Sequence, residues 1–183
     1  MGLMKDVWTF LWESDSIWSW IADFALAFIL VRFVFFPLMG IIFSTSLPLV
    51  VVESGSMEHN GPFDSWWQEK GQWYLDHNIT KEQFLSYPFP NGFNKGDIIV
   101  TRGADNYQRG EIIIFQTSVQ TTPIIHRVIY QNEDLTFATK GDHNTYQLPY
   151  ETSTPRSRII SKAVFRIPYL GWLKLFFVEL LKR

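Results

Sequence analysis

Residues Pro123 to Tyr130 read Pro-Ile-Ile-His-Arg-Val-Ile-Tyr, the longest β-branched run in the second half of this chain. Its isoleucine and valine content and its length are typical of a single strand. Four shorter runs of the same kind, each bounded by turn residues, cover 97–101, 111–115, 135–139 and 163–167. Short strands at this spacing predict a mainly β fold, a compact antiparallel β domain.

Two segments of different character flank these runs. Residues 60–94 mix aromatic residues with Gly, Pro and Asn and contain an amphipathic stretch, Ser65 to Tyr87, so we expect a partly helical insertion or lid. Residues 171–183 are apolar with interspersed charges, which predicts a short C-terminal amphipathic helix. At about 13 residues this helix is short for a membrane crossing, so we expect it at an interface or against the core.

A long apolar segment, Ile21 to Phe43, precedes the β-rich part. Its length matches the ~20 residues that a helix needs to cross a hydrocarbon layer of ~30 Å, so it predicts a single transmembrane helix, although Asp23, Arg32 and Pro37 interrupt it. Residues 1–20 carry four tryptophans, which indicates an interfacial segment. A cleaved signal peptide is the alternative. The length of the run and the acidic residues before it argue against that alternative.

Composition narrows the chemistry. The 183 residues suffice for one globular domain, expected at 44–170, plus the anchor. The formal net charge of −2 gives no electrostatic reason to expect a nucleic-acid partner. The chain has no cysteine, which excludes thiol catalysis and thiolate metal sites. Serine, histidine and carboxylate chemistry remains, and we expect neither a metal nor a cofactor.

Two residues qualify as a nucleophile and its base. Ser56 follows a glycine in the heptad Glu53-Ser-Gly-Ser-Met-Glu-His59, and only about a dozen residues of ~3.3 Å each separate it from the end of the apolar run. The alternative for the heptad is a polar turn after a membrane helix. His126 lies inside the first-quoted strand, which can hold an imidazole rigidly for general-base work. A structural histidine at a sheet edge is the alternative for His126.

A glycine turn, Thr139-Lys-Gly-Asp-His-Asn144, follows the next strand. Asp142 in this turn could accept a hydrogen bond from the imidazole and stabilise its cation, although Gly-Asp pairs are also common in turns. Lys140 is an alternative base, because a desolvated lysine can act with a serine.

The combination of motifs resembles type I signal peptidases of the archaeal and endoplasmic-reticulum branch. Five ordered motifs carry the resemblance: Ser54-Gly-Ser-Met57, Lys95-Gly-Asp97, Ile125-His-Arg-Val128, Lys140-Gly-Asp-His-Asn144 and Phe165-Arg-Ile-Pro-Tyr-Leu-Gly171. In the bacterial branch the position of His126 carries a lysine, so the resemblance selects a serine–histidine enzyme.

The resemblance implies a site and a setting. Ser56 would be the nucleophile, His126 the general base and Asp142 the supporting acid, with the Ser54 hydroxyl and the Ser56 backbone amide as the oxyanion hole. The substrates would be the signal peptides of preproteins, cleaved at the membrane lipid surface, by the chain alone or within a signal-peptidase or translocon complex. The chain would be a single-pass protein of the cell membrane with an extracytoplasmic catalytic domain, lumenal in the endoplasmic reticulum of a eukaryote.

Two positions depart from the family pattern. His59 stands where the family usually has proline, and Leu148 stands where it commonly has a second aspartate; Glu151, from a slightly longer loop, is the candidate second acid. The departures leave two alternatives open. One is a catalytically weak or inactive membrane-anchored β module that binds a partner. The other is a self-cleaving or specialised peptidase on the same scaffold.

Overall fold

The structure is a computed structural model that describes residues 2–181. The chain divides into two compact units, and the boundary in the sequence lies between Ile42 and Phe43. The C-terminal helix was expected to reach residue 183, and residues 182 and 183 lie outside the described part of the chain.

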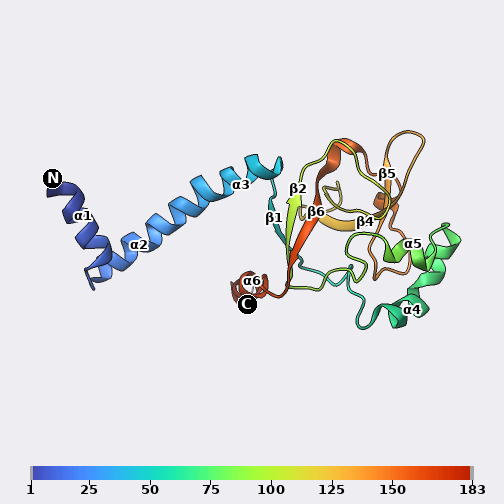
Figure 1. The fold of residues 1–183 in the computed structure, drawn as a ribbon, viewed down its shortest axis with the longest axis horizontal. Coiled ribbons are helices and arrows are strands. Elements are labelled where there is room, and N and C mark those ends of the chain that lie inside the picture. The colour runs from blue at the N-terminus through green and yellow to red at the C-terminus, as the bar shows by residue number, and fades with distance from the viewer. Residues whose placement is uncertain (1, 182–183) are drawn as a thin grey trace. The chain divides into compact units, whose positions relative to one another are not determined.

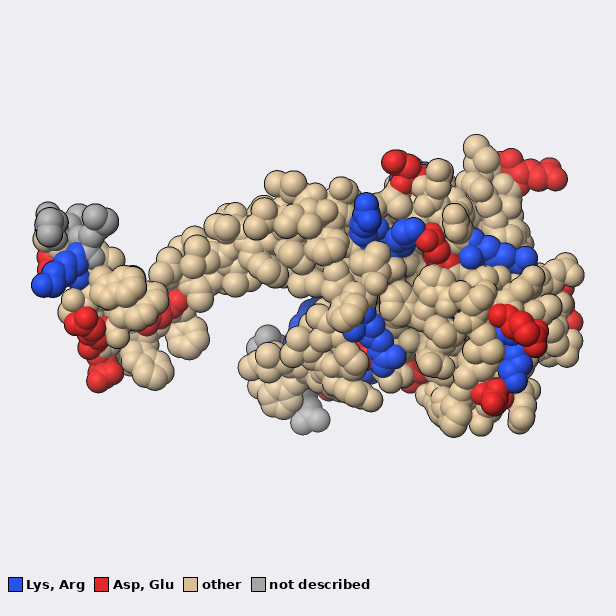
Figure 2. Space-filling view, in the orientation of Figure 1, with Lys and Arg blue, Asp and Glu red and all other residues tan. Residues whose placement is uncertain are grey.

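The N-terminal unit is helical. It contains α1 (Gly2–Trp12), α2 (Ile17–Leu30), the π-helical turn η1 (Val31–Phe35) and the start of α3 (Phe36–Phe43). The last three run on as one helix of 27 residues, the one helix among the described residues that is long and apolar enough to cross a membrane. It begins before Ile21 because the Ser16 side chain caps it, accepting from the Ser19 N–H at 3.2 Å. Most of its surface is uncharged (Figure 2).

The π-helical turn has a cause in the sequence. Pro37 lacks a backbone N–H, and its ring crowds the carbonyl group four residues earlier. The turn directly before it is wider than an α-helical turn, and the Phe36 N–H donates to the Val31 carbonyl, five residues back. The wider turn relieves this crowding without breaking the helix.

The second unit is built on one antiparallel sheet, which confirms the mainly β fold (Figure 1). Its six strands lie in the order β1-β2-β6-β3-β4-β5. Their bounds are β1 Leu49–Val51, β2 Ile98–Arg102, β3 Ile112–Phe115, β4 Ile124–Gln131, β5 Phe137–Lys140 and β6 Ile159–Ile167. Two short 3₁₀ helices, η2 (Pro149–Glu151) and η3 (Arg156–Arg158), connect β5 to β6. Strand β4, which carries His126, lies inside the sheet, and β1, which leads toward Ser56, is an edge strand.

The insertion packs against the sheet. It contains α4 (Phe63–Asp76) and α5 (Lys81–Leu85), the latter opened by a capping box between Thr80 and Gln83. A buried cluster joins these helices to β4 through Ile129, and its other members are Trp66, Tyr74, Ile79 and Phe84. The insertion is therefore a wall fixed to the strand that holds His126.

The C-terminal helix α6 (Trp172–Leu181) docks beside the loop that follows β1. The Gly171 N–H donates to the Gly96 carbonyl at 2.8 Å, and Lys174 pairs with Glu53 at 3.0 Å. Leu175 is buried, whereas Leu173 and Phe176 are more than half exposed. The helix therefore packs one face against the core, which is one of the two expected locations. Its other face is apolar and exposed.

We expect Phe84→Ala to lower the free energy of unfolding by about 3 to 5 kcal/mol, because Phe84 is fully buried and its ring contacts Trp66 and Tyr74. Chemical denaturation of the full chain in detergent measures this. The matched control is Leu85→Ala, on the same helix but 46% exposed, which should change stability by less than about 0.5 kcal/mol. Equal losses in both variants would contradict a packed insertion.

Candidate active site

Ser56 lies in a tight loop after β1. The Glu58 N–H donates to the Gly55 carbonyl at 3.0 Å and closes the turn. Met57 is buried and anchors the loop, Ser56 is half-buried, and Ser54 is exposed. The Oγ atoms of Ser54 and Ser56 are 3.2 Å apart. The backbone N–H of Ser56 makes no hydrogen bond within residues 2–181, so it is available to an incoming oxygen.

His126 is held by a buried carboxylate, that of Glu151. Its Nδ1 atom hydrogen-bonds to Glu151 Oε1, and both side chains are almost completely buried. The other carboxylate oxygen of Glu151 accepts from the Leu148 N–H at 2.7 Å. Because an ionised carboxylate only accepts, a neutral His126 ring carries its proton on Nδ1 and leaves Nε2 as an acceptor.

Gly141 separates His126 from the serine loop. A side-chain carbon built at Gly141 would lie 2.7 Å from His126 Nε2 and 2.7 Å from the Ser56 carbonyl oxygen. His126 Nε2 and the Ser56 carbonyl oxygen are therefore at most twice 2.7 Å apart. The same loop is tied to the serine, since the His143 N–H donates to the Ser56 carbonyl at 2.9 Å. Only glycine keeps this space open between the serine and the imidazole.

Asp142 is bound to other groups. Its carboxylate accepts from Arg127 Nε at 2.9 Å and from Arg127 Nη2 at 2.7 Å, and it contacts Tyr74 Oη and His59 Nε2, each at 3.2 Å. Burial alone raises the pKa of Asp142, but the Arg127 charge and the His59 and Arg127 hydrogen bonds hold that pKa well below its usual range. Within the described residues the hydrogen bond to His126 that was expected of Asp142 is made by Glu151 instead.

The strand register explains why Glu151, and not Asp142, hydrogen-bonds to His126. Arg127 pairs with Lys140 across β4 and β5. Paired residues share a face of the sheet and successive residues alternate, so Arg127 and Lys140 face away from His126. Asp142 follows Lys140 by two residues and meets Arg127. Sequence reasoning missed that Arg127 is the partner of Asp142. The available signal was the adjacent His126-Arg127 pair, because neighbouring residues in a strand face opposite sides.

Lys140 is buried on that opposite face. Its Nζ donates to the Gly141 carbonyl at 3.0 Å and lies over the rings of Trp73 and Tyr74. Burial lowers the pKa of Lys140 to about 8, against the opposing effect of the Asp142 charge. In the described structure no hydrogen bond joins Ser56 to Lys140, and none joins Ser56 to His126.

His59, at the position where the resemblance expects proline, is buried and well packed. Its ring stacks on Trp66 at 3.8 Å with an interplanar angle of 2°. With its hydrogen bond to Asp142, His59 links the serine loop to both the insertion and the glycine turn at 139–144. Among the described residues, no cluster of three or more His, Asp or Glu side chains is arranged to hold a metal ion.

Comparison with known proteins finds catalytic subunits of signal peptidase complexes among the relatives, and no family model matches the chain. Signal peptidase complex catalytic subunit SEC11 of Candida tropicalis is 22% identical over 157 residues, which cover 80% of this chain and 75% of the relative. The SEC11 subunit of Leptosphaeria maculans is 25% identical over 171 residues, covering 87% and 79%. SEC11C of Canis lupus familiaris is 36% identical over 66 residues, covering 33% and 34%. The chain is a homologue of signal peptidase complex catalytic subunits, the endoplasmic-reticulum branch of the type I signal peptidases.

Proposed function

We propose that the chain is a membrane-bound serine endopeptidase that removes signal peptides from secreted and membrane preproteins. Ser56 is the nucleophile and His126 the general base. One observation carries this assignment: His126 is bound through Nδ1 to a buried carboxylate, and its Nε2 borders the gap at Gly141, where the serine loop lies on the other side.

The reaction follows from these positions. His126 Nε2 takes the proton of the Ser56 hydroxyl while Oγ attacks the scissile carbonyl carbon. The imidazolium returns that proton to the leaving amine, and water then hydrolyses the acyl-enzyme with His126 again as base. The Ser56 N–H and the Ser54 hydroxyl stabilise the oxyanion, each donor contributing about 3 to 4 kcal/mol to lowering the barrier.

The two acids have different roles in this proposal. Glu151 fixes the tautomer of His126 and stabilises its cation, which makes it the acid of the triad. Asp142 keeps the catalytic turn in place through Arg127. The aspartate missing at Leu148 is then not needed for the hydrogen bond to His126.

Substrate binding is proposed at β1. Among the described residues this strand pairs only with β2, so its outer edge could pair with an extended peptide. Because β1 leads directly into the serine loop, a peptide paired with that edge would pass Ser56. The small residues near a signal-peptide cleavage site fit shallow pockets along such an edge.

The setting of the enzyme is also part of the proposal. The helix Ile17–Phe43 anchors the chain in the membrane, with the catalytic unit on the extracytoplasmic side. The relatives are named as subunits of a signal peptidase complex, which supports a partner complex for this chain as well.

Ser56→Ala should abolish cleavage of a preprotein by the full-length chain in lipid or detergent, with an unchanged unfolding midpoint, because it removes the nucleophile from a half-buried position. Ser157→Ala, at an exposed serine, is the matched control. Normal turnover by Ser56→Ala would exclude the serine mechanism. A wild-type chain without any cleavage activity would favour an anchored interaction module.

Glu151→Gln and Asp142→Asn should have different consequences. Glu151→Gln should lower kcat by about 10³ to 10⁴-fold with little change in KM, since the favoured tautomer of His126 is lost. Asp142→Asn should lower the free energy of unfolding by about 3 to 5 kcal/mol, because Arg127 loses its buried counter-charge. Steady-state kinetics and denaturation of both variants separate the roles. A larger kcat loss in a folded Asp142→Asn protein would return the triad role to Asp142.

Lys140→Met tests the alternative base. The folded-state pKa of Lys140 is lowered to about 8, so the unfolded chain binds more protons between about pH 8 and 10.4. Stability of the wild type should therefore rise with pH in that window, by on the order of 2 to 3 kcal/mol. Denaturation at several pH values should show this rise disappearing in Lys140→Met, while cleavage persists. Loss of cleavage in a stable Lys140→Met protein would instead make Lys140 the base.

A further inference from the structure

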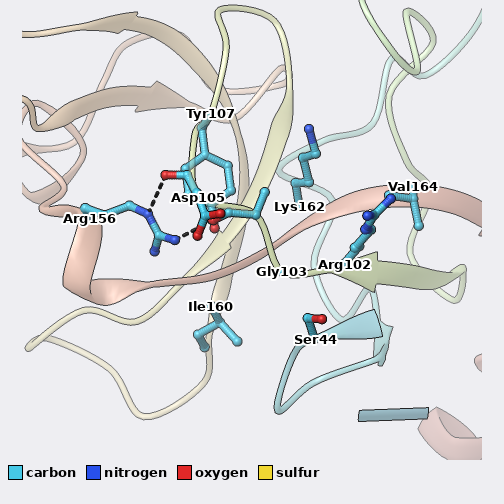
Figure 3. A pocket seen from close by; sticks show the side chains of 10 residues that line it. Ser44, Arg102, Gly103, Asp105, Tyr107, Arg156, Ile160, Lys162 and Val164 are labelled. Carbon is cyan, nitrogen blue, oxygen red and sulfur yellow. Dashed lines mark hydrogen bonds between the residues drawn. The ribbon is translucent and has the colours of Figure 1, made fainter. Parts of the chain in front are cut away.

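A hollow lies in the β-rich unit, apart from the serine loop. Its volume is about 660 Å³, within the range of small-molecule sites. Figure 3 shows Arg156 and Tyr107 on one side, Lys162 and Arg102 on the other, and Ser44 below them. None of the proposed catalytic residues lines it.

The lining is positively charged, although the chain as a whole is slightly negative. Arg102, Arg156 and Lys162 stand against a single acid, Asp105. Arg102 is exposed and forms no ion pair within the described residues. Arg156 donates only to uncharged backbone carbonyls, among them that of Asp105 at 3.3 Å, so its charge is not neutralised. Lys162 is the exception, since it pairs with Glu111.

Tyr107 adds an unused donor. Its side chain lines the hollow and is only 5% exposed, yet its hydroxyl has no hydrogen-bond partner in the described structure. A buried hydroxyl without a partner is costly, and a ligand oxygen that displaced the atoms covering it would satisfy it. The Arg156 guanidinium lies 4.9 Å from the centre of the same ring, so a donor and a charge are held together.

The hollow lies where the chain leaves the candidate membrane helix. Ser44, which lines it, directly follows the last residue of α3. The Gly103 N–H donates to the Phe43 carbonyl at 2.9 Å, and a side-chain carbon at Gly103 would lie 2.0 Å from the Ser44 carbonyl oxygen. The helix end is thus fixed to the rim. If α3 reaches the end of the hydrocarbon layer, the hollow lies in the headgroup region, about 5 to 7 Å thick on each side.

We propose that this hollow binds the phosphate group of an anionic membrane lipid. Arg102 and Arg156 contact the phosphate oxygens, for which guanidinium groups are well suited, and the Tyr107 hydroxyl donates to one of them. This assignment does not depend on the peptidase mechanism.

The test uses the full chain in non-ionic detergent with dioctanoyl phosphatidylglycerol, dioctanoyl phosphatidylcholine, glycerol 3-phosphate and inorganic phosphate as separate probes. Phosphatidylglycerol at about a hundred times its dissociation constant should raise the unfolding midpoint by about 5 to 10 °C. Phosphatidylcholine and the two soluble phosphates should raise it less at equal concentration. Native mass spectrometry should show phosphatidylglycerol retained by the chain.

Variants locate the effect. Arg102→Glu should abolish the rise, because it replaces an exposed, unpaired cation of the lining by an anion. Arg158→Glu is the matched control, since Arg158 is exposed, carries the same charge and does not line the hollow. Tyr107→Phe keeps the ring and removes the donor, and should weaken binding about tenfold.

Three results would overturn the proposal. Equal loss in Arg102→Glu and Arg158→Glu would mean that only net charge matters. Equal rises with phosphatidylcholine would exclude a preference for anionic lipid. Equal rises with inorganic phosphate or glycerol 3-phosphate would show that the hollow takes soluble phosphate and not a lipid.

Discussion

The buried pair of Arg127 and Asp142 organises the β-rich unit. Arg127 has five N–H donors, and all five are used: two on Asp142 and three on the carbonyls of Pro88, Phe89 and Gly110. One side chain thus joins β4 to the end of the insertion, the turn before β3 and the glycine turn that carries Asp142. A fully buried arginine is tolerated only when its hydrogen bonds are complete, which fixes the three loops together.

The insertion belongs to the same construction. Tyr74 and His59 complete the surroundings of Asp142, and Trp66 donates from its indole to the Asp142 carbonyl at 3.3 Å. Aromatic residues from α4 and α5 cover the side of β4 on which Arg127 lies, and His126 faces the other way. The aromatic residues of 60–94 therefore pack against β4 and support it, which is not what a movable lid would do.

The β-branched runs were enough to predict the strands, because strand propensity and turn boundaries are local properties. The start of β6 at Ile159 was missed, since its first half alternates polar and apolar residues less clearly. The assignment of the acid to His126 could not be made locally. Asp142 and Glu151 both follow β5, and only the pairing of Arg127 with Lys140 decides which carboxylate faces the imidazole. Likewise, no feature of the sequence around Lys140 predicts that this side chain is buried.

The π-helical turn at Val31–Phe35 affects how other helices can recognise this anchor. A π turn adds residues to one turn of the helix, so the side chains that follow it are rotated relative to those before it. An apolar stripe read off α2 at helical spacing does not continue on the same side along α3. A neighbouring transmembrane helix packed along the full length would therefore meet two different sets of residues, with Arg32 at the junction between them.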